Sequence, residues 1–433
     1  MMEERKLVGK MKLKVENVGM LQQAEIELNG ITVIAGENNT GKSTIGKILY
    51  CIFRAFYHLE EEVQKEREKA IFSTFQMYIN VVDSIKGDED KFVNLCKDFV
   101  QNRKEYKNNL IKIQDKVREN VNFISSGYIE DDLSMRQIAS KINDYLNVSD
   151  EELERFFIKK YLYAEFGDNV INVNEEKEMA QIDLNIQKYN IAFSVDKNND
   201  IVIYRNLSLM KDLVYIDDPF VWDEVNLNTK SKKGFTHRQD LVLKLLNCKE
   251  QDTNSLDELV REQRVQNVLK KIDTICKGKV EMTEDKKYYF TSDKYKKNLD
   301  ICNLSTGVKS VLLLKNLLLN GYIEENGTMI LDEPEIHLHP EWQLVFAEVI
   351  VLMQKEYNLN ILLNTHSPYF LNALEVYAKQ YKIENRCKYY VTDVRDQNTI
   401  IKDVTNDTEK IYEKLARPLQ DLENMEYAAN ENI

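Results

Sequence analysis

A glycine-rich segment near the N-terminus carries the clearest chemistry in this chain of 433 residues. It fits the pattern G-x-x-x-x-G-K-[ST] at Gly36, Gly41, Lys42 and Ser43. With this spacing, backbone N–H groups surround phosphate oxygens, the lysine reaches the β and γ phosphates, and the serine hydroxyl can ligate Mg²⁺. The pattern predicts a phosphate-binding loop rather than a chance glycine turn. The residues expected to contact nucleotide here are Gly36, Glu37, Asn38, Asn39, Thr40, Gly41, Lys42, Ser43 and Thr44.

An acidic pair and a histidine form two further clusters in the C-terminal third. Asp332 and Glu333 follow a short apolar run, and His366 follows the apolar residues 361–363. Such runs are typical of buried parallel strands, and α/β proteins bind ligands at the carboxyl ends of these strands. Asp332 can therefore hold the Mg²⁺ shell, Glu333 can orient and deprotonate an attacking water, and His366 can donate to a γ-phosphate.

The elements that position these residues can be predicted from periodicity. The β-branched run 31–35 predicts a strand before the loop, and apolar residues at helical spacing predict a helix over 45–56. Near the C-terminus, residues 388–403 are typical of two strands, and residues 407–429 of a helix kinked at Pro418.

The order of four motifs resembles that of the ABC-type ATPases. These are the phosphate loop, NLSTGVKS at 303–310, the acidic pair and the TH dipeptide at 365–366. The strand pair expected around 11–19 resembles the start of heads from the SMC-like branch. The resemblance covers about 11–57 and 300–375, and implies an α/β ABC-type P-loop head: a mixed central sheet flanked by helices and split by a helical and β insertion.

The resemblance also implies a mechanism. Heads of that family dimerise head to tail, so Ser305 and Gly307 of one copy would contact the γ-phosphate of ATP held by another copy. Glu333 would be the general base, and His366 the switch histidine. ATP and Mg²⁺ are the implied ligands, and a homodimer or a higher homo-oligomer is the implied assembly.

The chain departs from the family pattern in two places. The signature has Thr306 where glycine is common, and Val308 where glutamine or glutamate is common. No clear counterpart of the Q-loop glutamine is visible. The segment LVYIDDPF at 213–220 is a candidate for that place, and a surface turn beginning at the two aspartates is the alternative.

Four regions are expected from the patterning: 1–57 and 301–433 as the two parts of the head, 58–180 as a helical insertion, and 181–300 as a mixed α/β continuation. Helical periodicity extends over 58–122 and 132–163, with a capping box at 149–152. Uninterrupted heptads of a long coiled-coil arm are not visible. Alternation over 191–205 on both sides of KNND predicts a β-hairpin.

Composition limits the compartment and the partners. The net charge of −13 opposes a surface that clamps nucleic acid throughout, since phosphate neutralisation needs clustered Lys and Arg. The lysine- and tyrosine-rich segment 277–297 could form a local nucleic-acid groove, and a solvated hairpin is the alternative.

Apolar runs in the chain are shorter than the about 18 residues of a membrane span. The six cysteines lack C-x-x-C spacing. We expect reduced thiols, a cytoplasmic protein and no membrane partner.

The histidines outside the TH motif allow few further sites. His337 and His339 are two residues apart with Glu335 nearby, so a metal site is one alternative and a dimer-interface loop is the other. His58 and His237 belong to no constellation, and we expect them to be surface or packing residues.

Family likeness narrows the biological role. A compact SMC-like ATPase with an LDEPEIHLHP segment and without the appended TOPRIM nuclease of OLD-type relatives resembles the ATPase subunits of anti-phage systems such as PARIS and Septu. The resemblance implies a separate effector, a nuclease or toxin encoded in the same operon. The alternative is a DNA-repair or recombination-mediator ATPase of the SMC-like class that acts directly on DNA.

Overall fold

The computed structural model describes residues 10–78, 89–124, 132–174, 177–225, 235–249, 255–283 and 287–431. The chain divides into two compact units, which we call the head (Met1–Arg54 and Ile158–Ile433) and the helical unit (Ala55–Phe157). Within the described ranges, no helix is long and apolar enough to cross a membrane.

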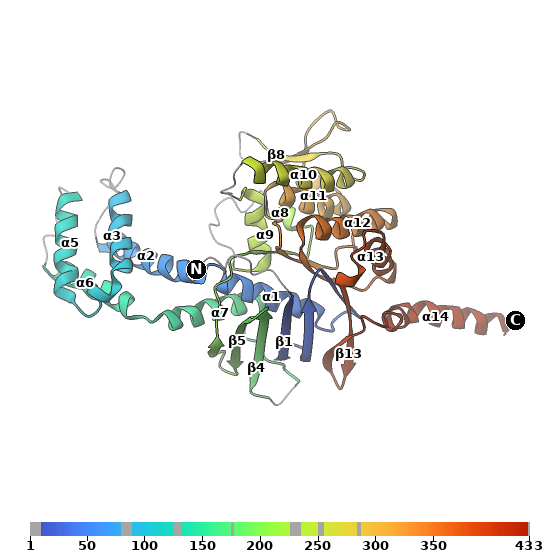
Figure 1. The fold of residues 1–433 in the computed structure, drawn as a ribbon, viewed down its shortest axis with the longest axis horizontal. Coiled ribbons are helices and arrows are strands. Elements are labelled where there is room, and N and C mark those ends of the chain that lie inside the picture. Colours follow the sequence, from blue (N-terminus) through green and yellow to red (C-terminus); the bar gives the residue numbers. More distant parts are fainter. Residues whose placement is uncertain are drawn as a thin grey trace. The chain divides into compact units, whose positions relative to one another are not determined.

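A mixed sheet forms the centre of the head. Its described strands follow the order β6-β5-β4-β1-β2-β14-β13-β3-β12-β11-β7 (Figure 1). The strands are β1 (Met11–Val18), β2 (Leu21–Leu28), β3 (Ile31–Ala35), β4 (Met179–Ile186), β5 (Tyr189–Asp196), β6 (Ile201–Arg205), β7 (Leu213–Ile216), β11 (Thr328–Asp332), β12 (Asn360–Thr365), β13 (Cys387–Arg395) and β14 (Asn398–Asp403). This mixed α/β architecture confirms the predicted fold class.

Five adjacent strands, β13, β3, β12, β11 and β7, run parallel. Their register aligns Thr365 with Ala35, Asp332 with Asn364, and Leu331 with Ile216. Since parallel strands present their carboxyl ends at one edge, the segments that follow β3, β12, β11 and β7 all meet there.

Helices cover both faces of this parallel block. On one face, Ile31 and Val33 share a core with apolar residues of α8 to α13. On the other face, α1 lies so close that a Cβ at Gly46 would be 2.9 Å from the Tyr215 hydroxyl. Burial on both faces explains why β3, β7 and the middle of β11 and β12 are mostly apolar. The head helices are α1 (Lys42–Phe56), α8 (Val221–Val225), α9 (His237–Leu246), α10 (Ser255–Ile272), α11 (Thr306–Leu319), α12 (Pro340–Tyr357), α13 (Pro368–Gln380) and α14 (Glu409–Glu431).

The helical unit has a core of its own. Its helices are α2 (Leu59–Tyr78), α3 (Glu89–Gln101), α4 (Arg103–Tyr106), α5 (Leu110–Ile124) and α6 (Asp132–Asn147), followed by α7 (Asp150–Phe166), which carries the chain into the head. Phe75, Phe92 and Phe99 are fully buried in this core. The predicted capping box is present, because Glu152 Oε2 accepts from the backbone N–H of Ser149 at 2.7 Å. Residues 79–88 of the helical prediction lie outside the described residues.

The observed division differs from the boundaries that the sequence suggested. The helical unit ends at Phe157, whereas the expected helical insertion extends to 180, because the last residues of α7 belong to the head. Strands β4 to β6 extend the head sheet, because β4 pairs antiparallel with β1. The predicted hairpin over 191–205 is confirmed by the antiparallel pairing of β5 with β6.

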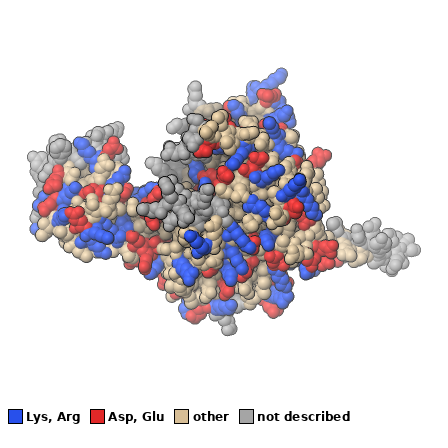
Figure 2. All heavy atoms as spheres, in the orientation of Figure 1, with Lys and Arg blue, Asp and Glu red and all other residues tan. Residues whose placement is uncertain are grey.

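The lysine-rich segment forms a small second sheet. Antiparallel strands β8 (Lys279–Met282), β9 (Tyr288–Thr291) and β10 (Leu299–Asp300) make up this sheet. Phe290 is buried in the head core and Tyr288 packs against that core, so these two rings pack inside the protein and do not form a surface on which bases could stack. On the face shown in Figure 2, basic and acidic side chains are interspersed over the head. Both observations favour the solvated-hairpin alternative over a nucleic-acid groove.

Candidate active site

The glycine-rich loop leaves β3 and ends where α1 begins at Lys42. A Cβ at Gly36 would lie 1.9 Å from Thr392 Oγ1 of β13, so only glycine fits there. Gly41 has φ +77° and Asn39 has φ +59°, left-handed conformations that turn the backbone sharply. The Thr40 hydroxyl donates to the Glu37 carbonyl at 2.8 Å. These features produce the tight loop that the sequence predicted.

Lys42 is buried at the mouth of this loop. Its Nζ donates to the carbonyl oxygens of Gly36 at 3.0 Å and Glu37 at 2.8 Å. It also lies 3.6 Å from Glu333 Oε1. Burial lowers the pKa of the Lys42 ammonium, while Glu333 and Asp332 oppose that shift. The loop and the acidic pair, far apart in sequence, therefore meet at one cation.

Asp332, the last residue of β11, is held by a donor on each carboxylate oxygen. The Tyr215 hydroxyl donates to Oδ2 at 3.2 Å, and Asn364 Nδ2 donates to Oδ1 at 3.0 Å. Both donors come from neighbouring parallel strands, β7 and β12. The carboxylate is buried, and its orientation is fixed by these two contacts.

Glu333 occupies the next position in a left-handed conformation with φ +50°. Its backbone N–H donates to the Asn364 carbonyl at 2.9 Å, which anchors this turn. The side chain is 25% exposed, and His366 Nδ1 lies 3.3 Å from its Oε1. Glu333 Oε1 thus stands between the Lys42 ammonium and the His366 ring.

A cavity of about 220 Å³ lies beside these groups, and Ser43, Asp217, Asp218, Asp332 and Glu333 contribute to its lining. Ser43 and Asp332 thus face the same space with a hydroxyl and a carboxylate. Mg²⁺ prefers few protein oxygen ligands and completes its shell with water and phosphate oxygens. The pair therefore fits the ion predicted from the sequence.

The signature segment lies at the start of α11. Ser305 is exposed as the N-cap residue of this helix, and its side chain makes no capping hydrogen bond. Gly307 is buried, and a Cβ there would lie 3.0 Å from the His337 carbonyl. The signature and the loop after the acidic pair are therefore in contact, and Ser305 presents its hydroxyl to solvent.

The segment after β7 belongs to the site. Asp217 lines the cavity, although Asp218 also makes a turn bond by accepting from the Phe220 N–H at 2.8 Å. This acidic segment therefore lines the cavity and also has the hydrogen bond of a turn, so both interpretations of 213–220 stay open. The loop at 335–339 forms no metal cluster. Within the described ranges, no group of three or more His, Cys, Asp or Glu could hold a metal ion, and His339 instead caps α12.

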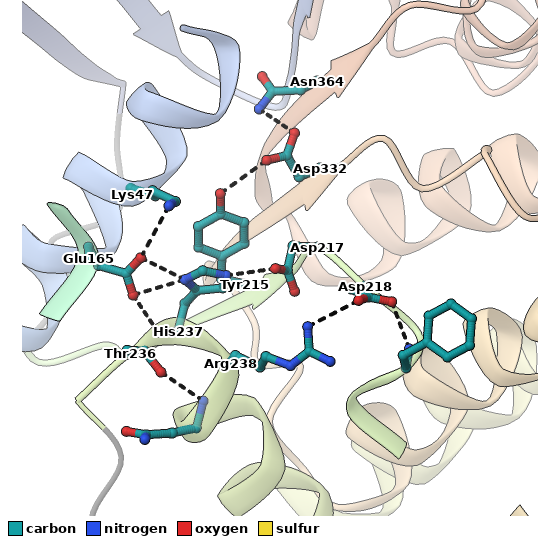
Figure 3. Close-up of polar contacts among 12 residues, drawn as sticks. Lys47, Glu165, Tyr215, Asp217, Asp218, Thr236, His237, Arg238, Asp332 and Asn364 are labelled. Carbon is teal, nitrogen blue, oxygen red and sulfur yellow. Dashed lines mark hydrogen bonds and ion pairs between the residues drawn. The ribbon is translucent and has the colours of Figure 1, made fainter. Parts of the chain in front are cut away.

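The expectation for His237 is confirmed in one part and wrong in the other. The ring is buried and stacks on Tyr215, as a packing residue does, but it also lies between Glu165 and Asp217 and so belongs to a constellation (Figure 3). Sequence reasoning also missed Tyr215 and Asn364, the two donors to Asp332. The only available signal was their place at the ends of strand-like runs. His58 contacts Glu61 and lies near the surface, as expected.

A phosphate-binding loop, an acidic pair and a histidine gathered at one edge of a mixed sheet define a P-loop ATPase head. The chain belongs to the family described as AAA ATPase domain, whose profile matches residues 11–371. Its ATPase activity, predicted from the motifs, is thereby confirmed.

Comparison with individual proteins adds a relative and two solved structures. The chain is 22% identical over 410 residues to the Retron Vc95 probable ATPase of Vibrio cholerae serotype O1 biovar El Tor, covering 89% of this chain and 76% of the relative. It is similar to the SMC head domain from Thermotoga maritima (TM-score 0.40, 10% identity, 91% of this chain and 98% of that chain). It is also similar to an Smc head domain derived from Pyrococcus furiosus, solved bound to the C-terminal domain of ScpA (TM-score 0.40, 12% identity, 93% and 98% covered).

Proposed function

We propose that Glu333 is the general base of the ATPase reaction, that Lys42 binds the β and γ phosphates, and that His366 contacts the γ-phosphate. The carrying observation is the position of Glu333 Oε1, 3.6 Å from Lys42 Nζ and 3.3 Å from His366 Nδ1. Residues of the loop from Gly36 to Thr44 supply the backbone N–H groups that hold the phosphates.

Ser43 and Asp332 would hold Mg²⁺ in this site. When bound, the ion neutralises charge on the phosphate oxygens during transfer. The chain's own residues prepare its place, because Tyr215 and Asn364 orient the Asp332 carboxylate before any ligand enters.

Two copies would close head to tail around ATP. The exposed Ser305 at the N-terminus of α11 supports this proposal, because a free hydroxyl at the N-terminal end of a helix suits a phosphate from another copy. Gly307 supports it too, since it packs on the loop that follows the acidic pair and so joins two surfaces that would both face the partner.

Mixed oligomers test this arrangement. A Ser305→Arg copy and a Lys42→Ala copy are each expected to be inactive alone, and a mixture is expected to form one working site per heterodimer. Native mass spectrometry would establish that heterodimers are present. An inactive mixture with heterodimers present would contradict the head-to-tail arrangement.

The biological role we propose is an ATPase subunit of a bacterial anti-phage system that holds a separate nuclease or toxin in its ATP-bound form. Support comes from the resemblance to such subunits, including those of PARIS and Septu, and from the likeness to a retron ATPase. Nucleotide-dependent closure would supply two states with different affinity for the effector.

Co-purification with the neighbouring operon product tests this role. Glu333→Gln, which retains ATP, is expected to recover the effector, and Lys42→Ala is expected to recover less. The chain expressed alone is expected to be harmless. Equal recovery by both variants would contradict the proposal, and ATPase activity stimulated by DNA in the absence of a partner would favour a DNA-repair role instead.

A further inference from the structure

His237 is buried between two carboxylates on one side of the ATPase site. It opens α9, where Thr236 caps the helix by accepting from the Gln239 N–H at 3.2 Å. Nδ1 of the ring lies 2.8 Å from Glu165 Oε2, and Nε2 lies 2.9 Å from Asp217 Oδ2 (Figure 3). The backbone N–H of His237 also donates to Glu165, at 2.7 Å.

Two acceptors, one on each ring nitrogen, require that both nitrogens carry a proton. Burial opposes the charged form, but the hydrogen bonds to Asp217 and Glu165 outweigh it and raise the pKa of His237 to about 9. The same contact changes the pKa of Asp217. Burial raises the pKa of that carboxyl, but the hydrogen bond from His237 outweighs burial and lowers it. The ring is therefore a cation held between the side chains of Glu165 and Asp217.

The cluster reaches Asp332 through Tyr215. The tyrosine and histidine rings stack with centroids 4.3 Å apart and planes 24° apart, and the Tyr215 hydroxyl donates to Asp332 Oδ2 at 3.2 Å. Gly46 makes this contact possible. A Cβ there would lie 2.9 Å from the hydroxyl and 3.0 Å from Ile330 Cγ2, so a side chain on α1 would displace the phenol.

The cluster also reaches the cavity through Asp217. The register of β7 with β11 pairs Ile216 with Leu331, so Asp217 and Asp332 are the next residues along the two chains, and both line the cavity that Ser43 also lines. Two carboxylates that line one cavity repel each other, and a cation bonded to one of them reduces that repulsion. His237 supplies this cation, and Glu165, itself 3.9 Å from Lys47, anchors the ring from behind.

We propose that His237 and Glu165 are positioning residues of the ATPase site. Through Asp217 and the Tyr215–Asp332 contact, they hold the acidic edge of the cavity in the arrangement that receives metal and nucleotide. Glu165 lies at the C-terminal end of α7, the helix whose first residues, 150–157, belong to the helical unit. Through His237, Asp217 at the cavity is thus linked by hydrogen bonds to Glu165. Glu165 lies on the segment that follows the helical unit in the chain.

The test compares two buried carboxylates changed in the same way. Glu165→Gln keeps the shape but removes the charge behind His237. We expect Mn²⁺ to bind the protein–ATP complex about tenfold more weakly by electron paramagnetic resonance, and the Mg²⁺ concentration for half-maximal ATPase to rise similarly. Binding of metal-free ATP should change less than about twofold, since the phosphate loop is untouched.

The matched control is Glu348→Gln. Glu348 is also buried and also paired, accepting from the Tyr381 hydroxyl at 2.8 Å and lying 2.5 Å from Lys271 Nζ, but it belongs to α12 and lines no part of the cavity. We expect a similar loss of thermal stability with wild-type metal affinity. A Glu165→Gln protein that loses stability but binds Mn²⁺ as tightly as wild type would overturn the proposal.

Tyr215→Phe provides a second variant that removes one hydroxyl and preserves the packing. We expect weaker Mn²⁺ binding, and an effect in the double variant with Glu165→Gln that is smaller than the product of the two single effects, because both act on one chain of contacts. Independent, multiplying effects, or normal Mn²⁺ affinity in Tyr215→Phe, would show that His237 and Glu165 do not act through this tyrosine.

Discussion

Glu333→Gln should strengthen ATP binding as well as slow hydrolysis. Loss of a general base is expected to reduce the turnover rate by about a hundredfold or more. The structure adds a second effect, because Glu333 Oε1 lies 3.6 Å from Lys42 Nζ and competes with phosphate for the same ammonium. Removing the carboxylate charge frees Lys42 and also removes an anion that repels the phosphates.

The size of the effect on binding follows from this distance. Two unit charges 3.6 Å apart attract by about 1.2 kcal/mol at a dielectric constant of 80 and about 4.6 kcal/mol at 20. The Glu333 side chain is 25% exposed, so solvent screening favours the lower value. About 1 kcal/mol corresponds to roughly fivefold tighter binding of ATP.

Equilibrium titration with a fluorescent ATP analogue and single-turnover hydrolysis measure the two effects separately. The gain in affinity should shrink in about 0.5 M salt, since screening weakens the competition that the mutation removes. Glu384→Gln is the control. It removes the same charge from an exposed side chain that lines no part of the cavity, and it should change affinity by less than about twofold. Unchanged or weaker ATP binding by Glu333→Gln would show that Glu333 does not compete with phosphate for Lys42. A wild-type hydrolysis rate would show that Glu333 is not the general base.

Three further predictions concern single residues. Lys42→Ala should abolish measurable ATP binding in the same titration, because it removes the cation that would hold the phosphates and its two hydrogen bonds to the loop. Gly36→Ala places a methyl group 1.9 Å from Thr392 Oγ1; it should cost about 1–3 kcal/mol of stability and weaken ATP binding, with partial recovery in Gly36→Ala/Thr392→Ala. His237 has a folded pKa of about 9, above its ordinary 6.5, so its stabilisation is complete below pH 6.5 and is lost as pH rises through 9. The free energy of unfolding of wild type should therefore exceed that of His237→Gln by about 3 kcal/mol more at pH 6 than at pH 10; a constant difference would contradict a charged histidine.

The sequence predicted those parts of the site whose residues lie next to one another in the chain. The phosphate loop, the acidic pair and the TH dipeptide each carry their chemistry within a few positions of a strand end, so motif and location were visible together. Their convergence was also predictable, because parallel strands bring their carboxyl ends to one edge. The strand alternation over 191–205 was equally local and gave the correct hairpin.

The parts that were missed depend on contacts between distant segments. His237 meets Glu165 across 72 positions, and Tyr215 meets Asp332 across 117. Neither pair has a local pattern, and a lone histidine before a helix resembles any surface residue. The pairing of β4 with β1 is likewise set by tertiary contacts, so no local pattern shows it.

The position of β3 in the sheet has a consequence for biosynthesis. This wholly buried strand, which leads into the phosphate loop, is paired on its two sides by β12 and β13, from residues 360–365 and 387–395. A ribosome must therefore translate most of the chain before either edge of β3 can be covered. Such long-range pairing is slow, and an apolar strand with open edges invites association with other chains. N-terminal fragments ending before residue 360 should aggregate on expression, even though they contain the entire phosphate loop.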